Sequence, residues 1–293
     1  MEAHKRAVER VITAMHERVG EPLSLQELAE IAIISPFHFD RVFQRITGVP
    51  PCQFLGALRL QAAKRLLLTT TLTVTDVCFE VGYNSLGTFT SRFTQLVGLP
   101  PRRLRQMAKE RPNPYMRMLR ERREPVGATV EKGAAVEGRL NLAGVEPGPV
   151  FIGLFRSRLP QSSPASCTVV TETGTYSMGH VADGKYHLFA SAFTWSEDPI
   201  TYLLPEADAV RIGMSEGAVL VKSGKVSGTI DVNLRPPDIT DPPLLTALPY
   251  LVSRHFRRKI DPGKQPGSAQ VNVSTVKESQ GSYAAGASGA SGL

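Results

Sequence analysis

The chain repeats one stretch of sequence, which reads FQRITGVPPCQF at residues 43–54 and FTQLVGLPPRRL at residues 93–104. Gly48 and Gly98 hold the same place in the two copies, and each is followed two residues later by a Pro-Pro pair. Glycine readily ends a helix in the left-handed conformation, and proline cannot continue a helix but can begin one. Each copy therefore marks the end of one helix and the start of another.

The similarity between the copies extends upstream of these stretches. LSLQELAEIA at residues 23–32 parallels LTVTDVCFEV at residues 72–81, with an offset of 49 residues where the later part of the repeat has 50. Each copy thus contains a short helix, a turn and a second helix, which is the layout of a helix-turn-helix. The repeat predicts two such units in tandem.

Local chemistry supports the boundaries of these helices. Ser24 and Glu27 have the spacing of a capping box, and Ser35-Pro36 supplies a cap followed by proline at the first helical position. In the second helix of each unit, apolar residues recur at helical spacing and are the expected core. They are Phe39, Val42, Phe43 and Ile46 in the first unit, and Phe89, Phe93, Leu96 and Val97 in the second.

Three further helices are predicted around the two units. A leading helix spans residues 3–19, a closing helix spans 101–109, and a long amphipathic helix at 51–68 joins the units. The joining helix would hold the units at a fixed distance. Its apolar stripe consists of Leu55, Leu58, Ala62 and Leu66.

The outward faces of the two second helices carry the candidate DNA-binding residues. In this motif the second helix enters the major groove of DNA. The candidates on the first unit are Phe37, His38, Asp40, Arg41, Gln44 and Arg45, and those on the second are Leu86, Gly87, Thr90, Ser91 and Arg92.

The candidates differ in the contact that their chemistry allows. Arg41 suits a two-pronged contact with guanine, and its alternative is an ion pair with nearby carboxylates. Phe37 suits a thymine methyl group, and its alternative is packing on the leading helix. Asp40 would accept from a cytosine amino group or orient Arg41, and His38 would bond a phosphate or cap the turn.

The remaining candidates fall into two groups. Gln44, Arg45, Arg92 and the arginines at 102–105 suit phosphate contacts, which set register without reading sequence. Glycine cannot read a base, and Leu86 can only touch a thymine methyl group. The first unit is therefore expected to be the stricter reader.

The tandem arrangement resembles the DNA-binding domain of the AraC/XylS family of transcription regulators over roughly residues 5–108. The second unit is similar to the sequence signature of that family. The residues that match the signature are Cys78, Val81-Gly82-Tyr83, Phe89, Phe93, Gly98, Pro101 and Arg105. The resemblance implies sequence-specific binding to double-stranded DNA, with activation as the expected mode. In that family the sensor domain usually precedes the DNA-binding domain, and here the order is reversed.

Positive charge is concentrated in the first 125 residues. Residues 1–110 hold 14 basic against 10 acidic side chains, residues 111–125 hold five against two, and the remainder balances. This asymmetry indicates a nucleic-acid-binding part joined to a part with another role. Residues 111–125 read as a hinge and a short basic helix, which either follows phosphates or is a solvated linker.

From residue 149 onward the pattern changes to the two-residue period of β-strands. Turn signals at Asp183-Gly184 and Ser223-Gly224 separate the strands, which predicts an antiparallel β-sandwich. The run GTYSMGHVADGKYHLFASAF at 174–193 is similar to a hairpin of transthyretin-like or carboxypeptidase-regulatory-like sandwiches. The other expected strands are PVFIGLFR, SCTVVT, GAVLVK and KVSGTIDVNL, while 126–145 is a linker or an irregular first strand.

Catalytic or metal chemistry finds little support in the sequence. His180 and His187 would be neighbours across the expected hairpin, but one such pair is too few for a metal site. The three cysteines, Cys52, Cys78 and Cys167, are expected to be small core residues, and no catalytic motif is present. Trp195 lies in an aromatic group that is either core or a ligand or partner surface, with Phe189, Phe193 and Tyr202.

The expected protein is therefore multidomain: an all-α tandem helix-turn-helix domain followed by an antiparallel β-sandwich. The expected divisions are the DNA-binding domain at 1–110, a basic hinge and linker at 111–145, the sandwich at 146–250, and a basic segment with a disordered tail at 251–293. Residues 244–260 would include a short amphipathic helix.

The expected function is a DNA-binding transcription regulator without catalytic activity, cofactor or metal. The alternative is a small-molecule-binding or enzymatic β domain that a helix-turn-helix module targets to DNA. Double-stranded DNA is the expected partner, with RNA polymerase and a ligand of the C-terminal domain as candidates. No apolar run approaches the roughly 18 residues of a membrane span, and no signal peptide is apparent, so a cytoplasmic location is expected.

Overall fold

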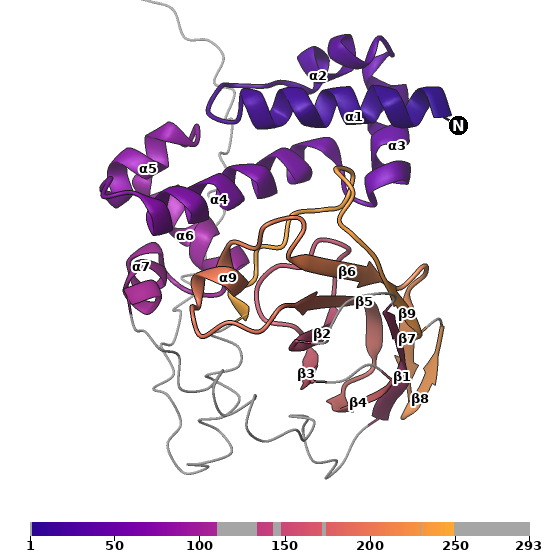
Figure 1. The fold of residues 1–293 in the computed structure, drawn as a ribbon. Coiled ribbons are helices and arrows are strands. Elements are labelled where there is room, and N and C mark those ends of the chain that lie inside the picture. The colour runs from indigo at the N-terminus through magenta and orange to yellow at the C-terminus, as the bar shows by residue number, and fades with distance from the viewer. Residues whose placement is uncertain (1, 110–133, 143–147, 172–173, 229, 249–293) are drawn as a thin grey trace, which may run out of the picture.

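The computed structural model describes residues 2–109, 134–142, 148–171, 174–228 and 230–248. A helical region comes first along the chain and a β-rich region follows it, and the two pack against each other (Figure 1). The helices of the first region are α1 (Glu2–Glu17), α2 (Leu25–Ala32), α3 (Pro36–Thr47), α4 (Pro51–Thr69), α5 (Val74–Glu80), α6 (Leu86–Val97) and α7 (Pro101–Lys109).

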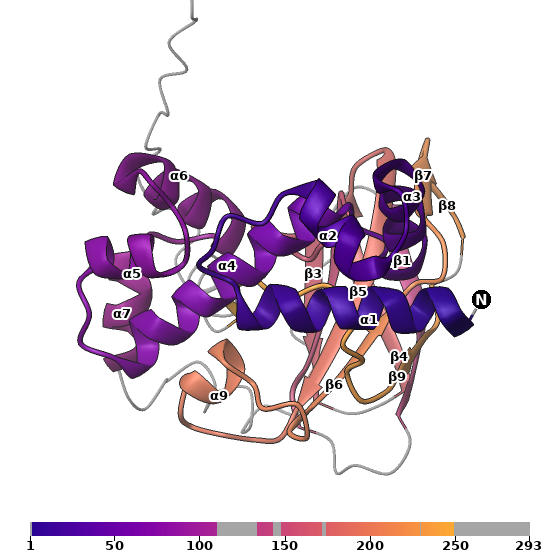
Figure 2. The ribbon, with the colours of Figure 1, turned by 90° about the horizontal axis from the view of Figure 1, so that it is seen from above.

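The helical region consists of two groups of helices joined by α4. Helices α1, α2 and α3 pack together, and so do α5, α6 and α7, while α4 contacts members of both groups. Figure 2 shows α3 and α6 toward one edge of the region and α1 toward the opposite edge. The two second helices of the repeat thus lie on a common side.

The predicted helix boundaries are confirmed, with one exception in the caps. Ser24 and Glu27 form the capping box, in which the N–H of Ser24 lowers the pKa of the Glu27 carboxyl. Gly48 and Gly98 end α3 and α6 in the left-handed conformation. Ser35 precedes α3 as expected, but its side chain makes no capping hydrogen bond.

The one-residue shift in the repeat lies in the turns between the helices. Ile33 and Gly82 are the equivalent left-handed residues, and Ser35 and Ser85 are the equivalent caps. One residue separates them in the first turn and two in the second. The second turn therefore accommodates the extra residue, Asn84, without changing the helices on either side.

Ile33 holds a conformation that suits it poorly. Its φ is 58° and its side chain is 85% exposed. The left-handed conformation costs an L-residue roughly 1–2 kcal/mol, whereas asparagine tolerates it. We expect Ile33→Asn to raise the free energy of unfolding by about 0.5–1 kcal/mol in urea titrations. Ile33→Val keeps the branched side chain and should change little; a loss of stability in Ile33→Asn would contradict the prediction.

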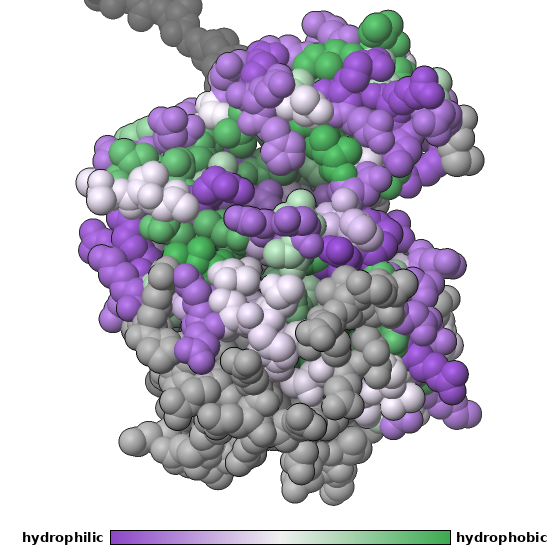
Figure 3. Space-filling model, in the orientation of Figure 1, coloured by the Kyte–Doolittle hydropathy of each residue, from purple (hydrophilic) through white to green (hydrophobic). Residues whose placement is uncertain are grey.

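Helix α4 is buried on more than the predicted stripe. Leu55 and Leu58 are buried as expected, but Ala62 and Leu66 are only partly so, whereas Leu60, Ala63 and Leu67 on another face are fully buried. The prediction of an amphipathic helix was wrong because α4 packs against helices of both groups, and residues 244–245 cover Lys64 on a further side. Figure 3 shows hydrophilic side chains over α1 and apolar patches in the band below it, where α4 runs.

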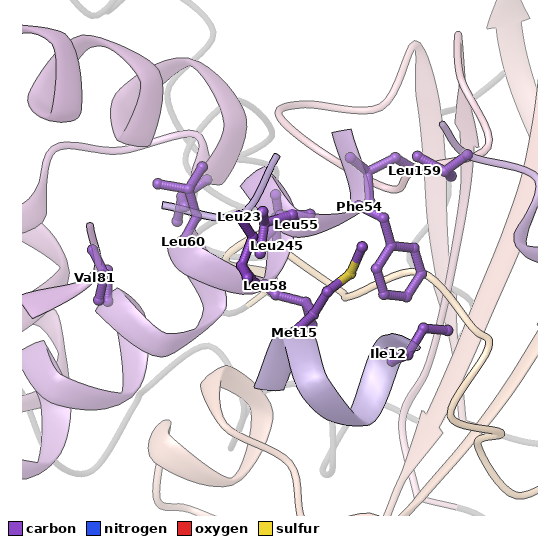
Figure 4. Close-up of a cluster of buried hydrophobic side chains, with 14 of the residues drawn as sticks. Ile12, Met15, Leu23, Phe54, Leu55, Leu58, Leu60, Val81, Leu159 and Leu245 are labelled. Atoms are coloured by element: carbon purple, nitrogen blue, oxygen red, sulfur yellow. The ribbon is translucent and has the colours of Figure 1, made fainter. Parts of the chain in front are cut away.

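Side chains from the second half of the chain complete the helical core. Leu159, Leu203, Leu245 and Ala247 belong to the same buried cluster as the helix residues. Figure 4 shows Leu159 beside Phe54, and Leu245 close to Leu55 and Leu58. Burial of these side chains joins the two regions into one packed body.

The most unusual contact between the regions involves Lys64 of α4. This side chain is only 1% exposed, and its Nζ donates to the carbonyls of Leu244 and Leu245 at 3.2 and 3.1 Å. Burial lowers the pKa of Lys64 to about 7. A backbone bond from Ala247 N to Val97 O, 3.2 Å long, ties the same segment to the end of α6.

The β-rich region contains two sheets. The three-stranded sheet has the order β4-β1-β9, and the larger has the order β3-β2-β5-β7-β8, with β6 also paired to β5. One buried cluster lies between the sheets, and α9 (Ile200–Leu203) covers the far side of the larger sheet. The strands are β1 (Ala134–Leu142), β2 (Val150–Phe155), β3 (Ser166–Val170), β4 (Gly174–Val181), β5 (Gly184–Phe193), β6 (Val210–Met214), β7 (Val219–Lys222), β8 (Lys225–Ser227) and β9 (Val232–Leu234).

Both faces of β2 and β5 are covered. Alternate residues of these strands face the other sheet or a second cluster that contains Phe151, Phe189, Phe193 and Tyr202. The rings of Phe151, Phe193 and Tyr202 meet edge to face. The core interpretation of these aromatic residues therefore holds, and Trp195 is partly buried against them.

Several strand predictions need correction. β4 pairs with β1 in one sheet and β5 belongs to the other, so 174–193 is not a hairpin, because the Asp183-Gly184 turn crosses between sheets. The expected strand at 225–234 is divided into β8 and β9 around Gly228, whose φ is 113°. β6 was not predicted.

One strand pair departs from the antiparallel expectation. β1, which lies in the segment expected to be a linker or an irregular first strand, pairs in parallel with β9. Two strands joined by a short hairpin must pair antiparallel, whereas parallel pairing requires a long connection between the strands. A long connection separates β1 from β9.

The burial of the cysteines follows the core prediction only in part. Cys78 is fully buried and Cys167 is half-buried, but Cys52 is exposed, so the prediction was wrong for Cys52. It lies in the first turn of α4, where Pro51, Phe54 and Leu55 occupy the buried side. The basic stretch at 111–125 and residues 251–293 lie outside the described residues.

Candidate nucleic-acid interface

Helix α3 exposes five of its six candidate residues as polar or aromatic side chains. Its core residues Phe39, Val42 and Phe43 are buried, which fixes the rotation of the helix. Phe37 is 75% exposed, so the alternative in which it packs on the leading helix was wrong. The exposed candidates with Phe37 are His38, Arg41, Gln44 and Arg45.

Arg41 stacks on Phe37. The guanidinium carbon lies 5.8 Å from the centre of the Phe37 ring, one helical turn away. Among the residues that the structure describes, no carboxylate pairs with Arg41, so the ion-pair alternative finds no support there. The ring orients the guanidinium while its donors stay free for another partner.

His38 and Asp40 lie at the margin of this surface. The His38 ring meets the His4 ring of α1 edge to face at 5.5 Å between centroids, so it faces the leading helix. Asp40 is half-buried. The geometry does not test whether His38 bonds a phosphate or caps the turn, or whether Asp40 accepts from cytosine or orients Arg41.

Helix α6 presents a smaller surface with little charge. Leu86 is 40% exposed, Gly87, Ser91 and Arg92 are exposed, and Thr90 is half-buried. A Cβ built on Gly87 would meet only the hydroxyl of Ser85, at 3.8 Å, so the backbone here is open to a close approach. Ser85 caps the helix by accepting from Thr88 N at 3.3 Å.

The β-rich region contacts the ends of α3 and α6 opposite to most of these residues. Arg158 lies against Gly48 at the end of α3, and backbone N–H groups of Ser162 and Ala247 donate to Leu96 and Val97 at the end of α6. Phe37 and Leu86, in the first turns of the same helices, remain exposed with the β-rich region docked. The outer surfaces of both helices are therefore accessible in this arrangement.

Two arginines of the helical region donate to backbone carbonyls near the ends of helices. Arg105 donates through Nε to Leu67 O at 2.9 Å and through Nη2 to Leu72 O at 2.7 Å. The prediction that it contacts phosphate was therefore wrong, because its donors close the end of α4. Arg59 likewise donates to Val19 O at 3.0 Å and to Glu21 O, which ties α4 to the segment after α1.

A sequence signal existed for Lys64 and was missed. Leu60 lies four residues before Lys64 and Leu67 three residues after it, so both share its helical face, and both are apolar. A lysine in such a stripe indicates burial. The carbonyls that accept its protons come from residues about 180 positions later, which periodicity cannot reveal.

No group of three potential metal-ligating side chains occurs in the described part of the chain. His180 and His187 lie on β4 and β5 in different sheets, so they are not cross-strand neighbours as expected. None of the described helices is long and apolar enough to cross a membrane.

Comparison with known proteins matches the repeat to helix-turn-helix domains. A family described as helix-turn-helix domain matches residues 28–107. The regulator YobQ of Bacillus subtilis is 36% identical over 91 residues, which is 31% of this chain and 38% of that protein. The XylDLEGF operon transcriptional activator 2 of Pseudomonas putida is 29% identical over 96 residues, covering 32% of this chain and 61% of that protein.

Solved structures match about a third of the chain. The DNA-binding domain of AdpA in complex with a target DNA has 29% identity and a TM-score of 0.34, covering 35% of this chain and 92% of that one. The chain thus matches less than two thirds of the two curated relatives. Residues 28–107 therefore match a helix-turn-helix domain family, and the two relatives are named as a transcriptional regulator and a transcriptional activator.

Proposed function

We propose that this chain is a sequence-specific transcription regulator that binds double-stranded DNA through α3 and α6. These helices would be the recognition helices of two helix-turn-helix units, α2–α3 and α5–α6. The observation that carries the proposal is the exposed Phe37-Arg41 stack on α3, which no described carboxylate neutralises and which the docked β-rich region leaves open. Activation is the proposed mode, with RNA polymerase as the partner and the cytoplasm as the location.

The division of labour along the chain is part of this proposal. Residues 1–110 would form the DNA-binding domain, and 146–250, together with β1, would form a β-sandwich in which β1 and β9 pair in parallel. The segments 111–145 and 251–293 would contribute basic charge around them. The sandwich would regulate the helical region, which it contacts at α3, α4 and α6.

A role without catalysis is favoured over the enzymatic alternative. The relative AdaA of Bacillus subtilis, 31% identical over 102 residues, is named as a bifunctional transcriptional activator and DNA repair enzyme. A methyl-accepting cysteine needs thiolate character, yet burial raises the pKa of the Cys78 thiol. The matched 102 residues cover 48% of AdaA, so the repair activity of that protein is not carried over.

The proposal predicts the size and symmetry of the DNA site. Two recognition helices on one side of the connector must enter successive major grooves about one helical turn, ~34 Å, apart. A single chain should therefore protect two adjacent groove segments of a non-palindromic site. Selection from genomic fragments followed by footprinting would measure this. Protection of one groove segment only, or a requirement for a palindrome, would contradict the tandem model.

A further inference from the structure

The β-rich region contains a cavity beside the loop that contacts both recognition helices. The cavity has a volume of about 360 Å³ and lies between Tyr186 of β5 and the loop of residues 156–165, here named the 156–165 loop. A volume of this order is at the lower end of small-molecule sites. It can therefore hold a small organic molecule rather than a peptide.

The lining of the cavity combines polar and apolar residues, and Arg156 gives it a positive charge. Arg156, Ser157, Gln161 and Ser163 contribute from the loop. The guanidinium carbon of Arg156 lies 5.6 Å from the centre of the Tyr186 ring, and within the described ranges no carboxylate pairs with it. Stacking on an aromatic ring holds the fork of donors in place for a planar or tetrahedral anion.

Tyr186 is a rigid support for this arginine. Its ring is fully buried in the core between the sheets, and its hydroxyl donates to Ala182 O at 2.9 Å. Arg156 is therefore stacked on a ring that the surrounding core holds in place. Preorganisation of this kind reduces the cost of binding a ligand.

The opposite side of the same loop contacts the helical region. Leu159 is buried in the helical core, and Arg158 lies against Gly48 at the end of α3. Ser162 lines the cavity and also donates from its backbone N–H to Leu96 O at the end of α6. One ten-residue loop thus connects the cavity to both recognition helices.

The conformation of Ser162 supports a functional role for the loop. Its φ is 58°, which is uncommon for a residue other than glycine, asparagine or aspartate. The Thr246 hydroxyl donates to Ser162 O at 3.0 Å, so the segment bound by Lys64 also holds this residue. Non-glycine residues in this region of φ and ψ concentrate at ligand clamps and switches.

We propose that this cavity is an effector site for a small organic anion, a carboxylate or a phosphate ester, whose binding tightens the grip of the chain on DNA. The anion would bridge Arg156 and the hydroxyl of Ser163, because the Ser157 hydroxyl already donates to Leu159 O, and would thereby hold the loop in its docked position. The docked loop fixes the ends of α3 and α6 relative to each other, which preorganises the two readers. The coupling to DNA rests on the proposed function, whereas anion binding does not.

The first experiment tests the site without DNA. Inorganic phosphate and acetate would be titrated separately into the full chain by calorimetry, at constant ionic strength maintained with chloride. We expect saturable binding of one of them, which identifies the headgroup, and at least tenfold weaker binding in Arg156→Gln. Arg139→Gln is the matched control, because Arg139 is an exposed arginine of β1 that does not line the cavity. No saturable binding of either anion, or unchanged binding in Arg156→Gln, overturns the site.

The second experiment tests the coupling. The affinity for a selected duplex is expected to rise about fivefold or more at a saturating concentration of the bound anion, within the usual range of allosteric coupling. In Arg156→Gln the same anion should not raise the affinity for DNA. It should only weaken DNA binding by competing with phosphates, an effect that the unmodified chain and the variant share. An equal response of the two proteins overturns the coupling. Failure to select any duplex would instead reject DNA binding, and the calorimetry would still decide the site.

Discussion

Replacing Lys64 by glutamate is expected to lower the free energy of unfolding by about 3–5 kcal/mol, the range observed when a buried charge loses its partner. The substituted carboxylate would face the carbonyl oxygens of Leu244 and Leu245, which now accept from Nζ at 3.2 and 3.1 Å. It would also lose its hydration, because the site is almost completely buried. Urea unfolding should show one weaker transition or two separate ones. An unchanged curve would contradict the contact between the regions.

The pH dependence of stability provides the control for Lys64. Burial lowers the pKa of this group to about 7 from its usual value of 10.5, so between pH 7 and 8.5 the unfolded chain keeps a proton that the folded chain releases. Stability should therefore rise with pH in this window, by about 1–2 kcal/mol. Lys64→Met has a similar length and no charge, and it should abolish the rise. The same rise in Lys64→Met would assign it to another group.

The limits of that pH window follow from the other buried groups. Burial lowers the pKa of His16 and His187, so their contributions are complete below pH 7. Burial raises the pKa of the Cys78 thiol and of the Tyr176 hydroxyl. Above about pH 8.5 the unfolded thiol releases a proton that the folded one keeps, which lowers stability as pH rises.

Arg41→Ala is expected to weaken binding to the selected DNA site by about 1–3 kcal/mol and to relax selectivity at one or two base pairs. Arg41 is exposed and its guanidinium is stacked on Phe37, and we propose that its donors make a two-pronged contact with guanine. Among the candidates on α6, which are Leu86, Gly87, Thr90, Ser91 and Arg92, only Arg92 has a long polar side chain. The half-site under α3 should therefore carry most of the base specificity, which saturation mutagenesis of the site would measure.

Two control variants separate base reading from phosphate contact. Arg45→Ala should weaken all sequences alike and reduce the slope of log affinity against log salt by about 0.9. Ser91→Ala should weaken all sequences slightly. Equal information content in the two half-sites, or a specificity loss in Arg92→Ala alone, would reject the asymmetric model.

The sequence by itself determined the helical region and the residues on its outer surface. The repeat, the capping box at Ser24 and the glycines at 48 and 98 are local signals, and local hydrogen bonding and backbone sterics suffice to end helices there. Helical periodicity also places Phe39 and Phe43 inward and Arg41 outward. These features depend on residues within a few positions of one another, so they could be derived without the fold.

Only the tertiary structure decided how the two halves fit together. The burial of Lys64 and Leu159, the crossing of β4 and β5 into different sheets, and the parallel pairing of β1 with β9 each depend on contacts between distant segments. Arg105 shows the same limit, because its motif position indicated a basic residue near DNA while its donors close the end of α4. Periodicity states which face of an element is apolar; it does not state what covers that face, and here the covering segments lie more than 90 residues away along the chain.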